Sequence, residues 1–358
     1  MESTLKELEV ISHSAFFVNA QDVFKNSKIR GYLEDLIFNS KTVFKHLDGQ
    51  VMNNSDVLRM ITYLSLLVES VPKEELSEAP EGFDNGNLET KNPLYLTEFL
   101  ENTNNFYTKK LGNYFFNSES FENGIINVFL DTERFKGRRK FNISHLAKFK
   151  YTDLVKFKQP ANYFILNDQY LGNLSESMLT ANLFPLIENC TEVLESDSIR
   201  SVIILTKIKD DFRQSGKTKH DKFDEEYCIR NIESLNGKIA QYLPKNVQYK
   251  FIILKEYLLI ADINKKVEDS SKLYSLKNSL KRLLDRFFIS NYLIGESSNS
   301  FGYLHEKGRV LADCDLTLSS TMDIEYVFEF ESSQKAIDDC ISYANDIAFE
   351  KYFIKFER

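Results

Sequence analysis

The chain of 358 residues contains no tryptophan and only four cysteines, and it lacks the short motifs of common metal sites. The cysteines are far apart and form no CxxC pair: Cys190, Cys228, Cys314 and Cys340. This spacing argues against a zinc ribbon and fits reduced thiols in a cytosolic protein. The five histidines are scattered and form no HExxH motif. We therefore expect neither a metal nor another cofactor.

Long apolar runs and a signal segment are missing as well. The longest apolar run, 251–263, is interrupted by charge and is too short to span a bilayer. No basic-then-apolar segment opens the chain. We therefore expect a cytoplasmic protein without membrane insertion; a prokaryotic source is a separate expectation that goes with the binding or scaffold role. Hydrophobic residues make up 42% and charged residues 27% of the chain, which is typical of globular protein, and the length allows two or three domains.

The hydrophobic pattern divides the chain into four parts. Apolar residues in 1–72 recur at roughly helical spacing, which predicts a helical region. The segment 73–93 is acidic and rich in proline and glycine, as expected of a linker or loop. Residues 94–195 are predicted as a mixed α/β region, and 196–358 as a separate α/β domain. The fold class is therefore α/β (or α+β): a helical N-terminal region, a mixed-sheet middle and a C-terminal α/β domain.

Individual elements follow from the same patterns. Strands are typical of short runs rich in aliphatic and aromatic residues, and helices of longer runs with one apolar face. The predicted helices cover about 95–110, 176–195, 223–242, 273–284 and 333–349. The predicted strands cover 124–131, 162–168, 201–207, 247–254, 258–262 and 324–330, with a hairpin after residue 284. Strands that alternate with helices favour a mostly parallel or mixed sheet covered on both faces.

Residues 134–158 carry the strongest local charge. Nine basic residues stand against one acidic residue, Asp153, so the segment is +8 and the rest of the chain is -8 - 8 = -16. The candidate binding residues among them are Arg134, Lys136, Arg138, Arg139 and Lys140. Phenylalanine and tyrosine are interleaved, and cations with aromatic side chains suit phosphates and bases of nucleic acid. The alternative is an edge hairpin with lysines outward and phenylalanines inward.

Two phosphate-related motifs are present only in part. Ser215-Gly216-Lys217-Thr218 resembles the end of a P-loop, but Asp211 stands where the loop requires glycine. The run His305-Glu306-Lys307 matches the first half of the His-x-Lys-x4-Asp motif, with Asp313 one residue late. In such a motif the histidine attacks phosphorus and the lysine holds the oxygens.

A longer block begins at Leu284. It reads Leu284-Asp285-Arg286 followed by three apolar residues, then Gly295-Glu296-Ser297 on a second predicted strand, then Gly302. With the strand, helix and strand predicted over 201–254, this block resembles a degenerate phospholipase D-like domain covering about 196–358. The resemblance implies that Asp285, Arg286 and Ser297 occupy motif positions. It also implies that Leu284 has replaced the nucleophilic histidine.

The sequence thus predicts a non-catalytic binding or scaffold protein, a pseudoenzyme whose C-terminal domain kept a phospholipase D-like fold. Its expected partner is another protein, a second copy of the chain, or nucleic acid bound through 134–158. The alternative is an enzyme, a metal-independent phosphodiesterase or nuclease that uses His305, Lys307 and Asp313.

Overall fold

In the computed structural model, the described residues form two sheets and the helices that flank them. The structure describes residues 7–13, 16, 25–27, 29–31, 41–45, 69–70, 91–96, 108–109, 112–128, 138–144, 149–173, 175–195, 200–209, 224–265, 270–280, 286–305, 309–311, 313–320 and 324–358. Parallel and antiparallel strands share the larger sheet, which confirms the predicted α/β class.

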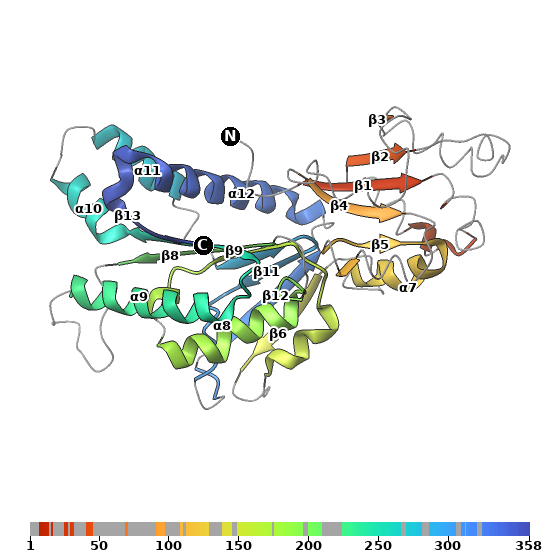
Figure 1. The fold of residues 1–358 in the computed structure, drawn as a ribbon, viewed down its shortest axis with the longest axis horizontal. Helices are drawn as coiled ribbons and strands as arrows, with labels where there is room; N and C mark the ends of the chain where they lie inside the picture. The colour runs from red at the N-terminus through yellow and green to blue at the C-terminus, as the bar shows by residue number, and fades with distance from the viewer. Residues whose placement is uncertain are drawn as a thin grey trace.

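The smaller sheet belongs to the N-terminal part of the chain, and all of its strand pairs are parallel. Its order is β3-β2-β1-β4-β5 (Figure 1). Its strands are β1 (Glu7–His13), β2 (Lys41–Lys45), β3 (Glu69–Ser70), β4 (Lys91–Leu96) and β5 (Phe115–Phe116). The prediction of a helical region over 1–72 is therefore wrong for the first three strands. Short apolar runs fit both a strand and a turn of helix, so periodicity does not separate them.

Two further N-terminal predictions need correction. The helix expected from about 95 is wrong at its start, because 95–96 belong to β4, which also takes 91–93 from the predicted linker. The strand expected over 124–131 is wrong, because α7 (Ser118–Val128) covers 124–128. That helix has a local start signal: the Asn117 side chain accepts a hydrogen bond from the Ser120 N–H (2.7 Å), and Ser120 Oγ accepts one from the Asn117 N–H (2.9 Å). The rest of the predicted linker lies outside the described residues.

The larger sheet has eight strands in the order β13-β9-β8-β7-β10-β11-β12-β6. Strands β7, β8 and β9 are parallel, and every other neighbouring pair is antiparallel. Its strands are β6 (Arg138–Ile143), β7 (Tyr163–Asn167), β8 (Arg200–Ile208), β9 (Val247–Lys255), β10 (Phe287–Ser290), β11 (Leu293–Ser297), β12 (Cys314–Ser320) and β13 (Phe353–Glu357). The boundary predicted at residue 196 therefore falls inside one continuous sheet.

Helices cover both faces of this sheet (Figure 1). On one face lie α8 (Glu176–Cys190), α9 (Glu225–Tyr242) and the 3-10 helix η3 (Tyr151–Phe157). On the other lie α10 (Glu256–Asn264), α11 (Ser270–Ser279), α12 (Ile324–Asn345) and the 3-10 helix η6 (Ile347–Tyr352). Alternate residues of β8 enter the two cores, Val202 and Ile204 on the α8 face and Ile203 and Leu205 on the α10 face.

The predicted strands at 162–168, 201–207 and 247–254 and the helix at 223–242 are confirmed. Two predicted strands are wrong. Residues 258–262 lie in α10, where Leu259 and Ile263, four residues apart, are both buried on one helical face. Residues 324–330 form the start of α12, because a helix extends cooperatively from its neighbouring turns and overrides local strand propensity.

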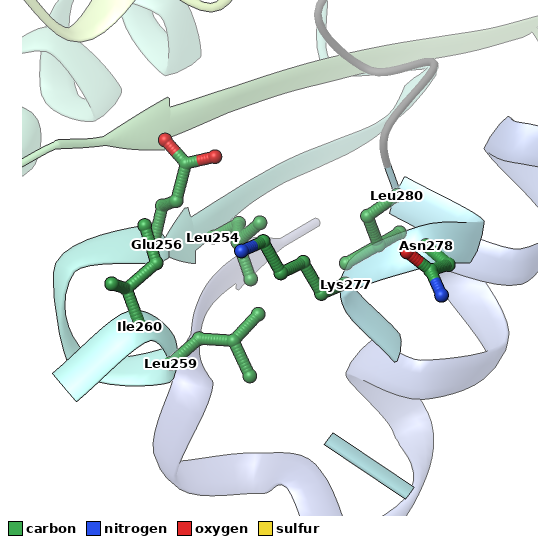
Figure 2. A pocket seen from close by; sticks show the side chains of 7 residues that line it. All are labelled: Leu254, Glu256, Leu259, Ile260, Lys277, Asn278 and Leu280. Carbon is green, nitrogen blue, oxygen red and sulfur yellow. The ribbon is translucent and has the colours of Figure 1, made fainter. Parts of the chain in front are cut away.

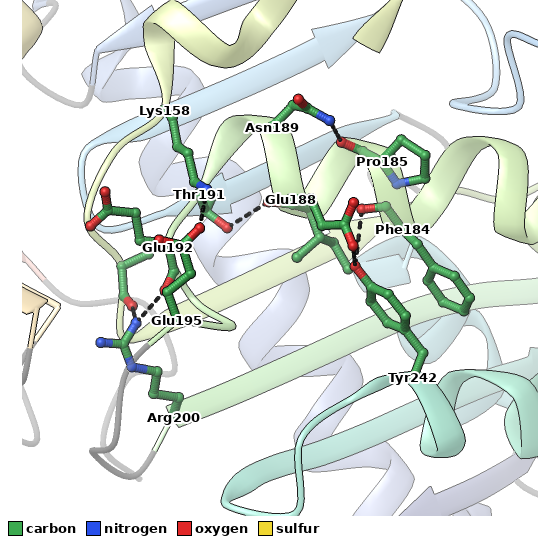
Figure 3. A network of polar contacts seen from close by, with 12 residues as sticks. Lys158, Phe184, Pro185, Glu188, Asn189, Thr191, Glu192, Glu195, Arg200 and Tyr242 are labelled. Carbon is green, nitrogen blue, oxygen red and sulfur yellow. Dashed lines mark hydrogen bonds and ion pairs between the residues drawn. The ribbon is translucent and has the colours of Figure 1, made fainter. Parts of the chain in front are cut away.

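The N-terminal part of the chain docks on the amino end of the parallel strands. Arg200, 1% exposed at the start of β8, donates to the carbonyl oxygens of Glu192 (2.7 Å), Lys109 (2.9 Å) and Ala161; Figure 3 shows its contact with Glu192. The Tyr292 hydroxyl, in the β10–β11 turn, accepts hydrogen bonds from the Tyr114 N–H (3.0 Å) and Asn113 Nδ2 (3.3 Å). The opposite end of these strands carries the candidate site.

Candidate functional site

The candidate site lies at the carboxyl end of β7 and β8, where open α/β sheets commonly hold ligands. Because β10 runs antiparallel to β7, its first residues return to the same end, and β11 finishes there. Four segments therefore meet at one edge: the residues after β7, those after β8, the start of β10 and the loop after β11.

Asp168 fixes the loop that follows β11. It is fully buried at the end of β7, and its carboxylate accepts three hydrogen bonds, from Ser300 Oγ (2.6 Å), the Phe301 N–H (2.8 Å) and the Tyr170 N–H (2.9 Å). Burial raises the pKa of Asp168, while these donors and the nearby Arg286 oppose that shift. The carboxylate is thus a buried charge whose lone pairs are used to position a loop.

Arg286 and Lys209 converge on one aromatic ring. The Arg286 guanidinium lies 5.1 Å and the Lys209 ammonium 5.2 Å from the centroid of the Tyr170 ring. Arg286 Nη1 donates to the Ser298 carbonyl (3.3 Å), and its buried Nε has no acceptor in the described part of the chain. Neither cation forms an ion pair with a described carboxylate. The site therefore offers two positive charges and an unused buried donor.

The β10–β11 hairpin brings Arg286 and Ser297 together. The Ser297 N–H donates to the Arg286 carbonyl (2.9 Å), and Ser297 Oγ accepts from the Asn299 N–H (3.3 Å). Gly295 lies opposite Phe288, and an added Cβ would stand 2.0 Å from the Phe288 ring. Packing against Phe288 thus requires glycine at position 295. Leu284 and Asp285 lie outside the described residues.

Buried polar contacts also hold the segment that follows Ser300. The Tyr151 hydroxyl lies 2.9 Å from the Phe301 carbonyl oxygen and 3.1 Å from Asn182 Oδ1, and its single proton is donated to one of these two acceptors at a time. Asn182 in turn accepts from the Leu304 N–H (2.7 Å) and donates to the Leu304 carbonyl (2.8 Å). The loop is therefore rigidly attached to η3 and α8, which gives the site a fixed wall.

The residues of the predicted phosphodiesterase motif lie farther along this loop. The His305 N–H donates to the Arg309 carbonyl (2.8 Å), beside the antiparallel bridge of Leu304 with Val310, and Asp313 is exposed just before β12. Neither side chain makes a hydrogen bond to Ser297. Lys307 lies outside the described residues, so the three-residue motif stays a prediction.

The basic stretch contains the edge strand of the larger sheet. Arg138, Arg139 and Lys140 lie on β6, which pairs only with β12 among the described strands. Lys140 forms an ion pair with Asp315 (2.9 Å), as Lys158 does with Glu195 (Figure 3). The interleaved aromatics Phe149, Tyr151 and Phe157 are buried in the core and cannot stack on bases. These three aromatics follow β6 and belong to η3 or to the segment just before it, while Phe141 on β6 itself is only partly buried. The nucleic-acid surface and the edge hairpin both stay predictions. Arg134 and Lys136 lie outside the described residues.

Sequence reasoning missed Asp168, Tyr170, Lys209 and Ser300. The only local signal was an Asn-Asp pair at the end of a predicted strand. The four residues come together because strands that are distant in sequence lie side by side in the sheet.

Within the described residues no cluster of histidine, cysteine and acidic side chains could hold a metal ion. None of the helices in the described ranges combines the length and apolar character needed to cross a bilayer. No family model, curated protein or solved structure matches the chain.

Proposed function

We propose that the protein is a non-catalytic binding protein, with a degenerate phospholipase D-like C-terminal part, that holds a phosphate group of a nucleic acid at the carboxyl edge of its larger sheet. The observation that carries the proposal is the pair of cations on Tyr170. Arg286 and Lys209 are held 5.1 and 5.2 Å from one ring centroid, and neither is neutralised by a described carboxylate.

The chemistry of Arg286 supports a phosphate ligand. A guanidinium recognises phosphate oxygens through parallel N–H donors, and a buried Nε without an acceptor is costly unless a ligand or water supplies one. Asp168, a described acid whose pKa the charge of Arg286 lowers, forms no ion pair with it and already accepts hydrogen bonds from Ser300, Phe301 and Tyr170. The positive charge of Arg286 is therefore directed at what lies outside the protein.

The resemblance to phospholipase D-like domains agrees with this arrangement. Strand β8, helix α9 and strand β9 precede the β10–β11 hairpin in the expected order, and Arg286 and Ser297 are adjacent across it. Leu284 at the motif's histidine position removes the nucleophile that covalent phosphoryl chemistry needs. Binding without catalysis is the function that these features favour.

The nucleic-acid backbone is the phosphate source that the exposed cations favour. Arg139, Lys140, Lys150 and Lys156 are exposed on β6 and around η3, although Lys140 is shared with Asp315. Since the aromatics beside them are buried, contacts with phosphates and not with bases are expected, which implies weak sequence preference. The proposed scaffold role also requires a partner, which is either another protein or a second copy of the chain.

The test is the affinity for a fluorescently labelled oligonucleotide, measured by anisotropy over a range of salt concentrations. Arg286→Gln and Lys209→Gln should each weaken binding several-fold. Each should also make the negative slope of log K against log salt shallower by about 0.7 to 0.9, the value for one lost phosphate contact. The double variant Arg139→Gln/Lys140→Gln measures any contribution of β6 separately.

Lys238→Gln is the matched control, because Lys238 lies on α9 and pairs with Glu176 (3.3 Å); its salt slope should equal that of the wild type. No binding at low salt, or equal slopes for the Arg286 and Lys209 variants and the wild type, would contradict the proposal. Hydrolysis of the oligonucleotide that disappears in His305→Ala would favour the phosphodiesterase alternative instead.

A further inference from the structure

A separate pocket opens between α10 and α11, over the carboxyl end of β9 (Figure 2). Its volume is about 300 Å³, at the lower end of the range of small-molecule sites, about 300 to 1,000 Å³. The lining residues are Leu254, Glu256, Leu259, Ile260, Lys277, Asn278 and Leu280. The volume favours a compact ligand.

Most of the pocket wall is apolar and firmly packed. Leu254, Leu259 and Leu280 are 3%, 1% and 4% exposed, and all three belong to the core that β9 shares with α10 and α11. Ile260, one residue on from Leu259, is only partly buried and adds apolar surface to the wall. An aliphatic group placed against these side chains would lose water contacts at little cost in protein rearrangement.

Of the charged side chains that line the pocket, Glu256 is in an ion pair and Lys277 is not. Glu256 is neutralised by Lys207, whose side chain is buried (4% exposed) and whose ammonium lies 3.0 Å from the Glu256 carboxylate. Lys277 reaches from α11 across the pocket toward Leu254 (Figure 2). It forms no ion pair with any described residue. A ligand here meets an apolar wall and one uncompensated positive charge.

We infer that this pocket binds a small carboxylate with an aliphatic chain, the chain lying against Leu254, Leu259 and Ile260 and the carboxylate meeting Lys277 Nζ. A cationic head group is disfavoured, because Glu256, the one acid among the described lining residues, is already paired with Lys207. The inference is independent of the proposed phosphate site, which uses the ends of β7 and β8 on the other side of the Lys207–Glu256 pair.

Isothermal titration of the full chain with octanoate tests the inference, with octylamine and acetate as ligand controls. Octanoate should bind, while octylamine, with the wrong charge, and acetate, without the chain, should bind at least tenfold more weakly. Lys277→Gln should weaken octanoate binding about two- to fivefold, the range for one exposed charge contact. Ile260→Trp should fill the pocket and abolish binding.

Lys265→Gln is the matched control, since Lys265 is exposed at the end of α10 and does not line the pocket; its affinity should be unchanged. Circular dichroism and thermal unfolding would verify that each variant is folded. Undetectable octanoate binding at millimolar concentration overturns the inference. So does equal affinity in the wild type, Lys277→Gln and Ile260→Trp, which would place the ligand elsewhere.

Discussion

At the scale of single residues, Asp168 is the side chain on which the candidate site depends. A buried carboxylate is costly unless its lone pairs are used, and here Ser300, Phe301 and Tyr170 supply three donors. Those donors belong to the loop that carries the site and to the residues that follow β7. The same contacts that satisfy Asp168 therefore determine where Arg286 and Tyr170 stand.

Replacing Ser300 by alanine removes the shortest of these bonds, 2.6 Å to Asp168 Oδ2. We expect the free energy of unfolding, measured by urea denaturation at neutral pH, to fall by about 1 to 3 kcal/mol. The pKa of Asp168 is already raised by burial above its ordinary value of 3.8, and the Ser300 donor lowers it. The variant should thus raise that pKa further, and its loss of stability should be smaller at acidic pH, where Asp168 is protonated.

Ser298→Ala provides the comparison. Ser298 is exposed and its hydroxyl accepts from the Asp315 N–H (2.9 Å), so its removal should cost less than 1 kcal/mol with little change between acidic and neutral pH. Equal losses in the two variants would show that the hydrogen bond from Ser300 to Asp168 is not special.

Sequence alone identified only part of this residue set. Arg286 and Ser297 lie in a local motif, so the resemblance found them. Asp168 and Lys209 do not belong to any motif. They become neighbours of Arg286 because β7 pairs with β10 on one side and with β8 on the other. The β10–β7 pairing joins residues 120 positions apart (287 − 167), and Lys209 is 77 positions from Arg286 (286 − 209); local patterns encode neither approach.

At the scale of elements, prediction succeeded where a pattern was long and had one consistent period. Helix α9 buries Cys228, Ile232, Leu235 and Ile239, the apolar face that its sequence predicts. Prediction failed for β1, which is short, and for the first turns of α12, which are rich in residues suited to either a strand or a helix. The choice there depends on neighbouring elements, which supply the parallel partners of β1 and the helical continuation of α12.

A charged contact joins α10 to the C-terminal η6. Asp262 accepts hydrogen bonds from Lys351 Nζ (2.7 Å) and the Tyr352 hydroxyl (2.9 Å). The Lys351 bond lowers the pKa of Asp262 below its ordinary 3.8, and the Asp262 bond raises the pKa of Lys351 above its ordinary 10.5. A lowered acid pKa contributes stability above 3.8, and a raised lysine pKa contributes stability below 10.5.

Asp262→Asn should therefore lose about 0.5 to 1 kcal/mol of unfolding free energy across the neutral range, a modest value because Lys351 is 56% exposed. The difference from the wild type should shrink as the pH falls below 3.8 and again as it rises above 10.5, as denaturation curves over a pH series would reveal. Glu350 lies on the same 3-10 helix, is exposed and forms no ion pair with a described residue, so Glu350→Gln should show no such pH-dependent difference. A pH-independent difference for Asp262→Asn would argue against the ion pair.

At the scale of the whole molecule, the chain is organised by pairings that span long stretches of sequence. Strand β6 pairs with β12 and β13 with β9, so the larger sheet collects residues from 138 to 357. The domain boundary predicted at residue 196 rested on a change of local pattern. That change marks the start of regular alternation between strands and helices, while the sheet itself begins with β6.

The two sheets meet through the segment around Gly112, and this contact can be tested with one methyl group. Gly112 has φ of +69°, and an added Cβ would stand 2.6 Å from the Ala161 carbonyl carbon and oxygen and 2.9 Å from the Asn162 nitrogen. These are backbone atoms of the segment that enters β7, so they cannot turn aside as a side chain would. Gly112→Ala combines an unfavourable left-handed backbone with a collision.

We expect Gly112→Ala to lower the free energy of unfolding by about 2 to 4 kcal/mol and to weaken the neighbouring bonds of Tyr114 and Asn113 to Tyr292. Hydrogen exchange should show faster exchange of the Tyr114 amide. Gly237→Ala is the control: Gly237 lies inside α9 with nothing within 4 Å of an added Cβ, so this variant should be more stable by about 0.5 to 1 kcal/mol. If Gly112→Ala instead matches the wild type in stability and Tyr114 exchange, then the close approach of Gly112 to Ala161 does not fix the junction between the sheets.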